Sequence, residues 1–263
     1  MGETLAGRLE SILPGGRGVW IPMDHGVSSF PEPGLENTEA AVDAAIKGGA
    51  DAIVLHKGAV SYHSERTGWG RFVCHVSAST VHGGKNSQNK VIVANALECL
   101  ERGAIGISAQ VNLGIESENE MIHSLGAVTS QAHEYDLPVL GMFYPRGPNL
   151  ALDPSDLTRA VSHAARIAWE LGCHVVKVPW TGSVESFRIV TSSVPIPVLI
   201  SGGQTTSFSD LLDIVEKSIK AGGSGVCIGR NVFSANNPTT HVRALRAIVH
   251  DESTLDEAFR HLE

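Results

Sequence analysis

The chain has 263 residues, of which 42% are hydrophobic and 18% charged, and its formal net charge is −8 at pH 7. This length suits one large α/β domain, because barrels of that class reach ~250 residues as a single unit. The net negative charge and the lack of any run rich in Lys and Arg exclude a typical nucleic-acid-binding surface, which needs clustered positive charge.

The sequence offers no sign of a targeting or membrane-spanning segment. Its first residues lack the apolar stretch of a signal peptide, and no apolar run approaches the ~20 residues that span a bilayer. The cysteines Cys74, Cys99, Cys173 and Cys227 are widely spaced and form no CxxC pair, so we expect free buried thiols in a reducing compartment. The expected location is the cytoplasm, without a membrane or nucleic-acid partner.

Short runs rich in Val and Ile alternate with amphipathic stretches of helical period from about residue 19 onwards. This alternation is typical of parallel βα units. It predicts strands at 19–23, 52–56, 72–76, 105–109, 138–142, 174–178, 197–200 and 225–228. Apolar residues at spacings of three and four predict helices at 38–47, 91–102, 118–134, 155–171, 183–191, 209–221 and 240–249.

Eight predicted strands favour a closed (β/α)₈ barrel, the TIM barrel, as a single domain over residues 1–263. Residues 1–18 would form an N-terminal extension or helix. The alternative is an open, doubly wound sheet, whose usual pointer is a GxGxxG loop after the first strand. Here the sequence Asp24-His25-Gly26-Val27-Ser28 follows that strand instead, so we favour the barrel.

The active site of such a barrel lies at the C-terminal ends of its strands. Lys177 gives the strongest signal there, because Val176 and Val178 flank it and a buried ammonium is costly without a purpose. Desolvation favours the free amine, which attacks a ketone to form an imine. The alternative is a lysine that reaches out to solvent or pairs with a carboxylate.

Imine chemistry also needs groups that move protons. Asp24 and Tyr144 follow the first and fifth predicted strands, and both side chains are expected at the same mouth of the barrel as Lys177. A carboxylate there acts as a general base and a phenol as a general acid. Taken singly, Asp24 also fits a helix or loop cap, and Tyr144 an aromatic residue before a turn.

The last two predicted strands end in glycine-rich segments, Ser201-Gly202-Gly203 and Gly229-Arg230-Asn231. Barrels of this type commonly bind phosphate at these positions, and Arg230 would add charge-assisted hydrogen bonds. The histidines His25, His56 and His75 at three strand ends leave a zinc site as an alternative. No HxH or HxxxH pair accompanies them, so we expect neither a metal nor another cofactor.

Seven sequence segments together resemble the archaeal-type class I aldolase family, which includes fructose-bisphosphate aldolases and 2-amino-3,7-dideoxy-D-threo-hept-6-ulosonate synthases. The segments occur in one consistent order and begin near the first strand. They are Met-Asp-His-Gly-Val-Ser (23–28), Val-Leu-His-Lys-Gly (54–58), His-Val-Ser-Ala-Ser-Thr (75–80), Met-Phe-Tyr-Pro-Arg-Gly (142–147), Val-Lys-Val-Pro-Trp-Thr-Gly (176–182), Ser-Gly-Gly (201–203) and Ile-Gly-Arg-Asn-Val-Phe (228–233).

The resemblance implies a (β/α)₈ fold with Lys177 as the Schiff-base lysine, Asp24 as proton acceptor and Tyr144 as proton donor. It also implies contacts with a phosphorylated substrate through the residues His25, Ser28, Arg146, Ser201, Gly202, Gly203, Gly229 and Arg230. Two positions depart from the family's patterns. Met142 stands where the fructose-bisphosphate aldolases usually have Trp, and 204–206 read Gln-Thr-Thr where relatives tend to have Pro-Lys-Thr.

We therefore expect a Schiff-base aldolase or transaldolase that forms or cleaves a C–C bond of a phosphorylated keto sugar, with an aldehyde as second substrate. The heptulosonate synthases are the nearest model, because they match better at Met142. The alternatives are a class I fructose-1,6-bisphosphate aldolase, a thiolase acting on a phosphorylated diketone, and a non-catalytic barrel that binds sugar phosphates. The resemblance further implies a homo-oligomer, such as a decamer.

Overall fold

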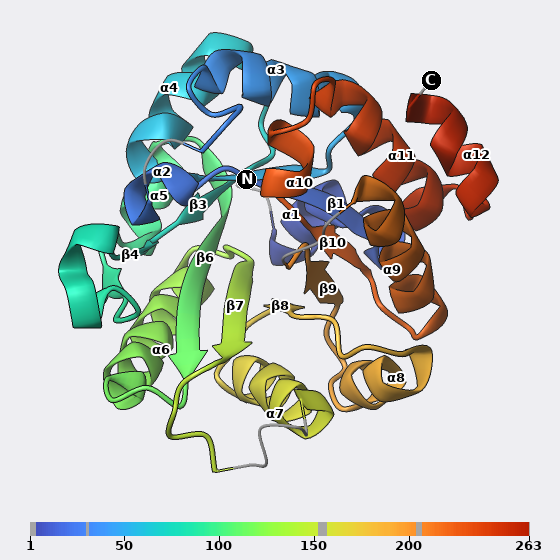
Figure 1. Cartoon of the computed structure of the whole chain (residues 1–263). Helices are drawn as coiled ribbons and strands as arrows, with labels where there is room; N and C mark the ends of the chain where they lie inside the picture. The colour runs from blue at the N-terminus through green and yellow to red at the C-terminus, as the bar shows by residue number, and fades with distance from the viewer. Residues whose placement is uncertain (1–3, 30–31, 152–156, 204–206, 263) are drawn as a thin grey trace.

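The computed structural model describes residues 4–29, 32–151, 157–203 and 207–262 of the chain. Its centre is a closed barrel of parallel strands, ordered β1-β10-β9-β8-β7-β6-β3-β2 around the ring (Figure 1). This closure confirms the predicted (β/α)₈ barrel and excludes the open sheet. The strands are β1 (Gly18–Pro22), β2 (Ala52–His56), β3 (Phe72–His75), β6 (Ala104–Leu113), β7 (Val139–Pro145), β8 (Val175–Val178), β9 (Val198–Ser201) and β10 (Gly225–Cys227).

Helices surround the barrel and cover the outer face of its strands (Figure 1). The short helices α2 (His25–Ser28) and α10 (Arg230–Phe233) follow β1 and β10 directly. The chain ends in α12 (Leu255–Phe259) and the turn η3 (Arg260–Leu262). The larger helices are α3 (Thr38–Gly48), α4 (Lys57–Thr67), α5 (Ala96–Glu101), α6 (Glu118–Glu134), α7 (Leu157–Glu170), α8 (Val184–Ser192), α9 (Phe208–Lys220) and α11 (Pro238–His250).

Side chains alternate between the barrel interior and the helix layer, because successive residues of a strand point to opposite faces. On β8, Val175 belongs to the interior apolar cluster and Val176 to the outer one. Helix α1 (Leu5–Ile12) precedes the barrel, and Ile12 packs into the interior cluster beside Trp20. The Trp20 indole Nε1 donates a hydrogen bond to the Ile12 carbonyl at 2.7 Å. The N-terminal end of the barrel is thereby filled.

The largest departure from the predicted elements lies between β3 and β6. The helix predicted over 91–102 is wrong in its first half, where β5 (Val91–Ile92) pairs with β4 (Ser77–Ala78) as an antiparallel hairpin. The turn η2 (Val81–Asn86) connects these two strands and projects from the barrel at the left of Figure 1. The helix begins only at Ala96, because the Asn95 side chain accepts the Glu98 backbone N–H at 2.8 Å and caps it.

Two further differences from the predicted elements concern the polar composition of one helix and the length of two strands. Helix α4 went unpredicted because it is largely polar and buries only Val60 and His63. Strands β6 and β7 extend past their predicted ends at 109 and 142, so Tyr144 lies on β7 itself rather than in the loop that follows. Within the described ranges, no helix combines the length and apolar character that crossing a membrane requires.

Candidate active site

The alternation within the strands decides which side chains reach the C-terminal mouth of the barrel, because residues two apart share a face. On β8 the interior position after Val175 is Lys177. On β7 the interior position after Met142 is Tyr144. Asp24 follows β1 by two residues, and its side chain is only 14% exposed. Lys177, Tyr144 and Asp24 therefore meet above the interior apolar cluster.

A cavity of about 450 Å³ opens at this mouth. All the residues predicted to act in catalysis or substrate binding contribute to its lining, although they come from the ends of several strands. They are Asp24, His25, Ser28, Tyr144, Arg146, Lys177, Ser201, Gly202, Gly203, Gly229 and Arg230. The structure thus brings the predicted set together around one cavity.

Lys177 is buried, with 7% of its surface exposed. Its pKa nevertheless lies above the usual lysine range: burial disfavours the ammonium, but Cys227, Tyr144 and Asp24 together outweigh the desolvation. Burial alone therefore does not set the pKa of Lys177, contrary to the expectation from the sequence. Attack on a carbonyl needs the free amine, so an imine mechanism at Lys177 would require a neighbouring base to accept its proton.

Asp24 is held as a carboxylate beside this ammonium. Burial raises the Asp24 pKa, but the neighbouring groups His75, His25 and Lys177 oppose it, and the net pKa lies well below the usual range. His75 lies beneath the carboxylate, with its Nε2 3.7 Å from Asp24 Oδ2 and its Nδ1 2.8 Å from Ser108 Oγ. Burial lowers the His75 pKa to about 3, so this ring is neutral at neutral pH.

The ends of β9 and β10 form a corner suited to a phosphate group. Gly203 has a φ of 59°, a left-handed conformation that favours glycine. Gly229 passes so close to β1 that a Cβ atom there would lie 2.3 Å from the Pro22 carbonyl oxygen. The exposed Arg230 follows at the start of α10. Compact backbone and a guanidinium in one corner of the cavity can receive the oxygens of a phosphate.

The family of the chain follows from its similarity to known proteins. The model of the family described as DeoC/LacD family aldolase matches residues 19–235. The chain belongs to this family of aldolases. The aldolase is 35% identical over 255 residues to 2-amino-3,7-dideoxy-D-threo-hept-6-ulosonate synthase 1 of Archaeoglobus fulgidus, with 97% of this chain and 94% of the relative covered. These matches confirm the predicted family and the predicted enzyme class, a class I aldolase.

A second relative carries a phosphate in its name. The aldolase is 35% identical over 237 residues to the 2-amino-4,5-dihydroxy-6-oxo-7-(phosphonooxy)heptanoate synthase of Streptomyces griseus, with 89% of this chain and 85% of the relative covered.

A solved archaeal fructose 1,6-bisphosphate aldolase superposes with a TM-score of 0.82 at 26% identity, covering 94% of this chain and all of that one. A related structure, with a TM-score of 0.81 at 26% identity over 94% of this chain and 99% of that one, has its catalytic Lys bound covalently to a carbinolamine intermediate of the substrate.

The three histidines considered as zinc ligands lie at the ends of different strands. Within the parts of the chain that the structure describes, no three His, Cys, Asp or Glu residues are placed to hold a metal ion together. His25 lines the cavity, whereas the rings of His56 and His75 contact each other at 5.3 Å between centroids. The segment 204–206, where the sequence departs from its relatives, lies outside the described residues.

The sequence analysis missed several residues that line the cavity, among them Lys90, Gln88 and Gln110. Lys90 precedes β5, in the stretch whose hairpin was not predicted. Gln110 lies on β6 beyond the predicted end of that strand. The periodic pattern of Ser108 and Gln110 on alternate positions was the available signal, because it continues the interior face past residue 109.

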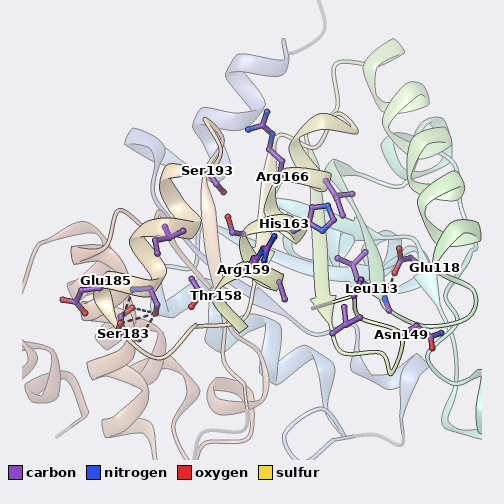
Figure 2. A pocket seen from close by; sticks show the side chains of 18 residues that line it. Leu113, Glu118, Asn149, Thr158, Arg159, His163, Arg166, Ser183, Glu185 and Ser193 are labelled. Atoms are coloured by element: carbon purple, nitrogen blue, oxygen red, sulfur yellow. Dashed lines mark hydrogen bonds between the residues drawn. The ribbon is translucent and has the colours of Figure 1, made fainter. Parts of the chain in front are cut away.

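A larger cavity, of about 1110 Å³, lies on the outside of the aldolase between helices α7 and α8 and the loop after β6. Figure 2 shows its labelled side chains, which include Arg159, His163 and Glu185. It contains none of the predicted site residues. The predicted site residues therefore line the smaller cavity at the barrel mouth, and volume alone does not single out a candidate site.

Proposed function

We propose that the enzyme joins a phosphorylated ketone to an aldehyde through an imine on Lys177. The observation that carries this proposal is the buried Lys177 beside the Asp24 carboxylate and the Tyr144 hydroxyl, in a cavity that Gly229 and Arg230 also line. The superposed archaeal aldolase with a covalently bound catalytic Lys supports the same chemistry. A barrel that only bound sugar phosphates would not need Lys177, Asp24 and Tyr144 together.

In the proposed mechanism the Lys177 ammonium first gives its proton to Asp24. The amine then adds to the ketone carbon to form a carbinolamine, and loss of water, with Tyr144 protonating the departing hydroxyl, leaves the imine. The Tyr144 phenolate left by that step removes a proton from the neighbouring carbon, which gives an enamine. That carbon attacks the aldehyde carbon, a C–C bond forms, and the aldehyde oxygen takes a proton from Tyr144. Hydrolysis of the new imine releases the product and reprotonates Tyr144, and Asp24 returns its proton to the lysine.

The name of the Streptomyces relative suggests the substrate. The heptanoate made by the Streptomyces relative has a carboxylate at C1, an amino group at C2, a ketone at C6 and a phosphate at C7. An enamine on C6 reacts at C5, so the new bond joins C5 to C4. We propose that this enzyme also joins a three-carbon ketone to a four-carbon amino aldehyde, aspartate semialdehyde. Fructose-1,6-bisphosphate cleavage is the second candidate, because the superposed structures include enzymes of that name.

An assay of paired substrates tests the proposal. Purified enzyme is supplied with dihydroxyacetone phosphate and either aspartate semialdehyde or glyceraldehyde 3-phosphate, in the presence of EDTA, and products are measured by mass spectrometry. We expect the seven-carbon amino keto acid phosphate, and we expect EDTA to leave the rate unchanged, because the imine supplies the electron sink that zinc supplies elsewhere. Formation of fructose-1,6-bisphosphate alone would favour the second candidate, and loss of turnover that zinc restores would contradict an imine mechanism.

The phosphate corner gives a second expectation. Arg230→Ala should raise KM for a phosphorylated ketone by about 10- to 100-fold while changing kcat little, because a charged hydrogen bond contributes roughly 1.5–3 kcal/mol. Steady-state kinetics measure this, with Arg188→Ala on the outer helix α8 as the control. An unchanged KM would show that Arg230 does not contact the phosphate.

Two further features belong to the proposal. We propose that the enzyme acts in the cytoplasm and as a homo-oligomer, as its amino-acid sequence and its resemblance to the archaeal-type class I aldolases lead us to expect. Light scattering during size-exclusion chromatography measures the number of subunits.

A further inference from the structure

The cavity contains a second lysine besides Lys177, supplied by the hairpin insert between β3 and β6. Lys90 directly precedes β5 and is 8% exposed. Its ammonium donates hydrogen bonds to Ser79 Oγ at 2.7 Å and Ser28 Oγ at 3.3 Å. A residue of the hairpin insert, which is not part of the barrel sheet, thus places a positive charge at the mouth of the barrel.

This ammonium has no adjacent counter-ion. Among the residues that the structure describes, no carboxylate oxygen lies within 4.0 Å of Lys90 Nζ, and its hydrogen-bond partners are neutral hydroxyls. Burial lowers the Lys90 pKa, and the more distant Asp24 carboxylate only partly offsets that effect. A buried cation without a close anion is costly, and an anionic ligand would remove that cost.

Arg146 adds a second cation to the lining of the cavity. Its guanidinium lies over the Tyr144 ring, 4.3 Å from the ring centroid, at the exposed rim. The charges of Arg146 and Lys90 repel each other, and this repulsion also lowers the Lys90 pKa. No carboxylate of the described chain forms a salt bridge with either residue. Two cations that line one cavity and have no salt bridge within the described chain favour the binding of an anion there.

The order of strands places Arg146 and the phosphate corner on either side of Lys177. The corner follows β9 and β10, Arg146 follows β7, and β8 with Lys177 lies between them. Lys90 reaches the cavity from the insert after β3 and contacts Ser28, which follows β1. A substrate with an anionic group at each end would therefore extend from the corner toward Arg146 and Lys90 with its middle over Lys177. The heptanoate named for the Streptomyces relative has that form, with a carboxylate at C1 and a phosphate at C7.

We propose that Lys90 and Arg146 bind the carboxylate of the acceptor aldehyde. This inference rests on the proposed aldolase function and adds the reason for its choice of acceptor. The phosphorylated ketone occupies the corner with Arg230 and reacts with Lys177, and the amino aldehyde enters from the hairpin side with its carboxylate on Lys90. The aldehyde carbon then faces the enamine. A neutral aldehyde of similar size lacks the group that Lys90 and Arg146 recognise.

The variant Lys90→Gln tests the inference, with dihydroxyacetone phosphate as ketone and three acceptors: aspartate semialdehyde, glyceraldehyde and glyceraldehyde 3-phosphate. We expect kcat/KM for aspartate semialdehyde to fall about 10- to 100-fold, the usual effect of one charged hydrogen bond. The value for neutral glyceraldehyde should change less than about twofold. Lys85→Gln is the matched control, since Lys85 lies exposed on the same insert. Arg146→Gln should show the same selectivity as Lys90→Gln.

Three outcomes would overturn the inference. Equal losses with aspartate semialdehyde and glyceraldehyde would show that Lys90 supports Asp24 rather than the acceptor. A loss confined to glyceraldehyde 3-phosphate would assign the site to a phosphate. An unchanged enzyme would show that Lys90 has no role in acceptor binding. Borohydride trapping of the ketone on the enzyme tests the imine mechanism separately from the role of Lys90. Failure to trap the ketone on the wild-type enzyme would contradict the imine mechanism. Normal trapping on Lys90→Gln would show that the ketone site of this variant is intact.

Discussion

Replacement of Lys177 by Arg is expected to reduce kcat by more than ~10⁴, because guanidinium keeps the positive charge but does not deprotonate to give a nucleophile. Lys177→Ala should be equally inactive. Neither change should unfold the barrel, because Lys177 lines the cavity at the strand ends, above the interior apolar cluster. Steady-state kinetics and circular dichroism measure the two effects separately.

Borohydride provides the direct test of the covalent intermediate. Added during turnover, it should reduce the imine to a secondary amine, and the gain in mass should map to the peptide that contains Lys177. Lys57→Arg is the matched control, because Lys57 forms a salt bridge with Glu98 at 3.1 Å and does not line the cavity. Substantial activity in Lys177→Arg, or a label on Lys57 or Lys90, would show that the nucleophile is a different lysine.

Tyr144→Phe is expected to lower kcat by about 10²- to 10⁴-fold, the usual effect of removing a general acid. The ring, and with it the contact to Arg146, would be retained. Because Phe leaves Lys177 and Asp24 in place, the variant should still form some imine, so trapping by borohydride should decline less than turnover. Rapid-quench measurements of imine formation and of product formation distinguish these steps.

Tyr62→Phe is the control for this change. Tyr62 is exposed on α4, and its hydroxyl donates a hydrogen bond to Glu39, far from the chemistry of the barrel mouth. It should keep wild-type kinetics. If Tyr144→Phe also kept them, the proton donor would have to be another group, and Asp24→Asn would then show whether the carboxylate serves both proton transfers.

The barrel and its site were predictable because both depend on local patterns. Apolar runs such as Ala52–His56 give strands, and the polar residue that ends each run falls at the C-terminal mouth of a parallel barrel. Lys177 and Asp24 are of this kind. Their joint position needed no knowledge of long-range contacts, because the closed ring brings all strand ends to one mouth.

Other properties depend on contacts that a sequence pattern does not contain. The pKa of Lys177 could not be predicted from burial alone, since Cys227, Tyr144 and Asp24 reverse the effect of desolvation. Lys90 was missed for a related reason. Its route into the cavity requires the pairing of β4 with β5, and strands of two residues are too short to produce a periodic signal.

The hairpin insert has a consequence for how such enzymes diversify. Lys177 and the phosphate corner belong to barrel strands whose register is fixed by a neighbouring strand on each side. Lys90 belongs to the hairpin insert, which lies outside the barrel sheet. If Lys90 has the proposed role, exchange of this hairpin insert would alter the choice of aldehyde and leave Lys177 and its neighbours unchanged. A protein engineer has the same opportunity: grafted hairpins of different charge offer a route to aldolases that accept new aldehydes on an unchanged catalytic frame.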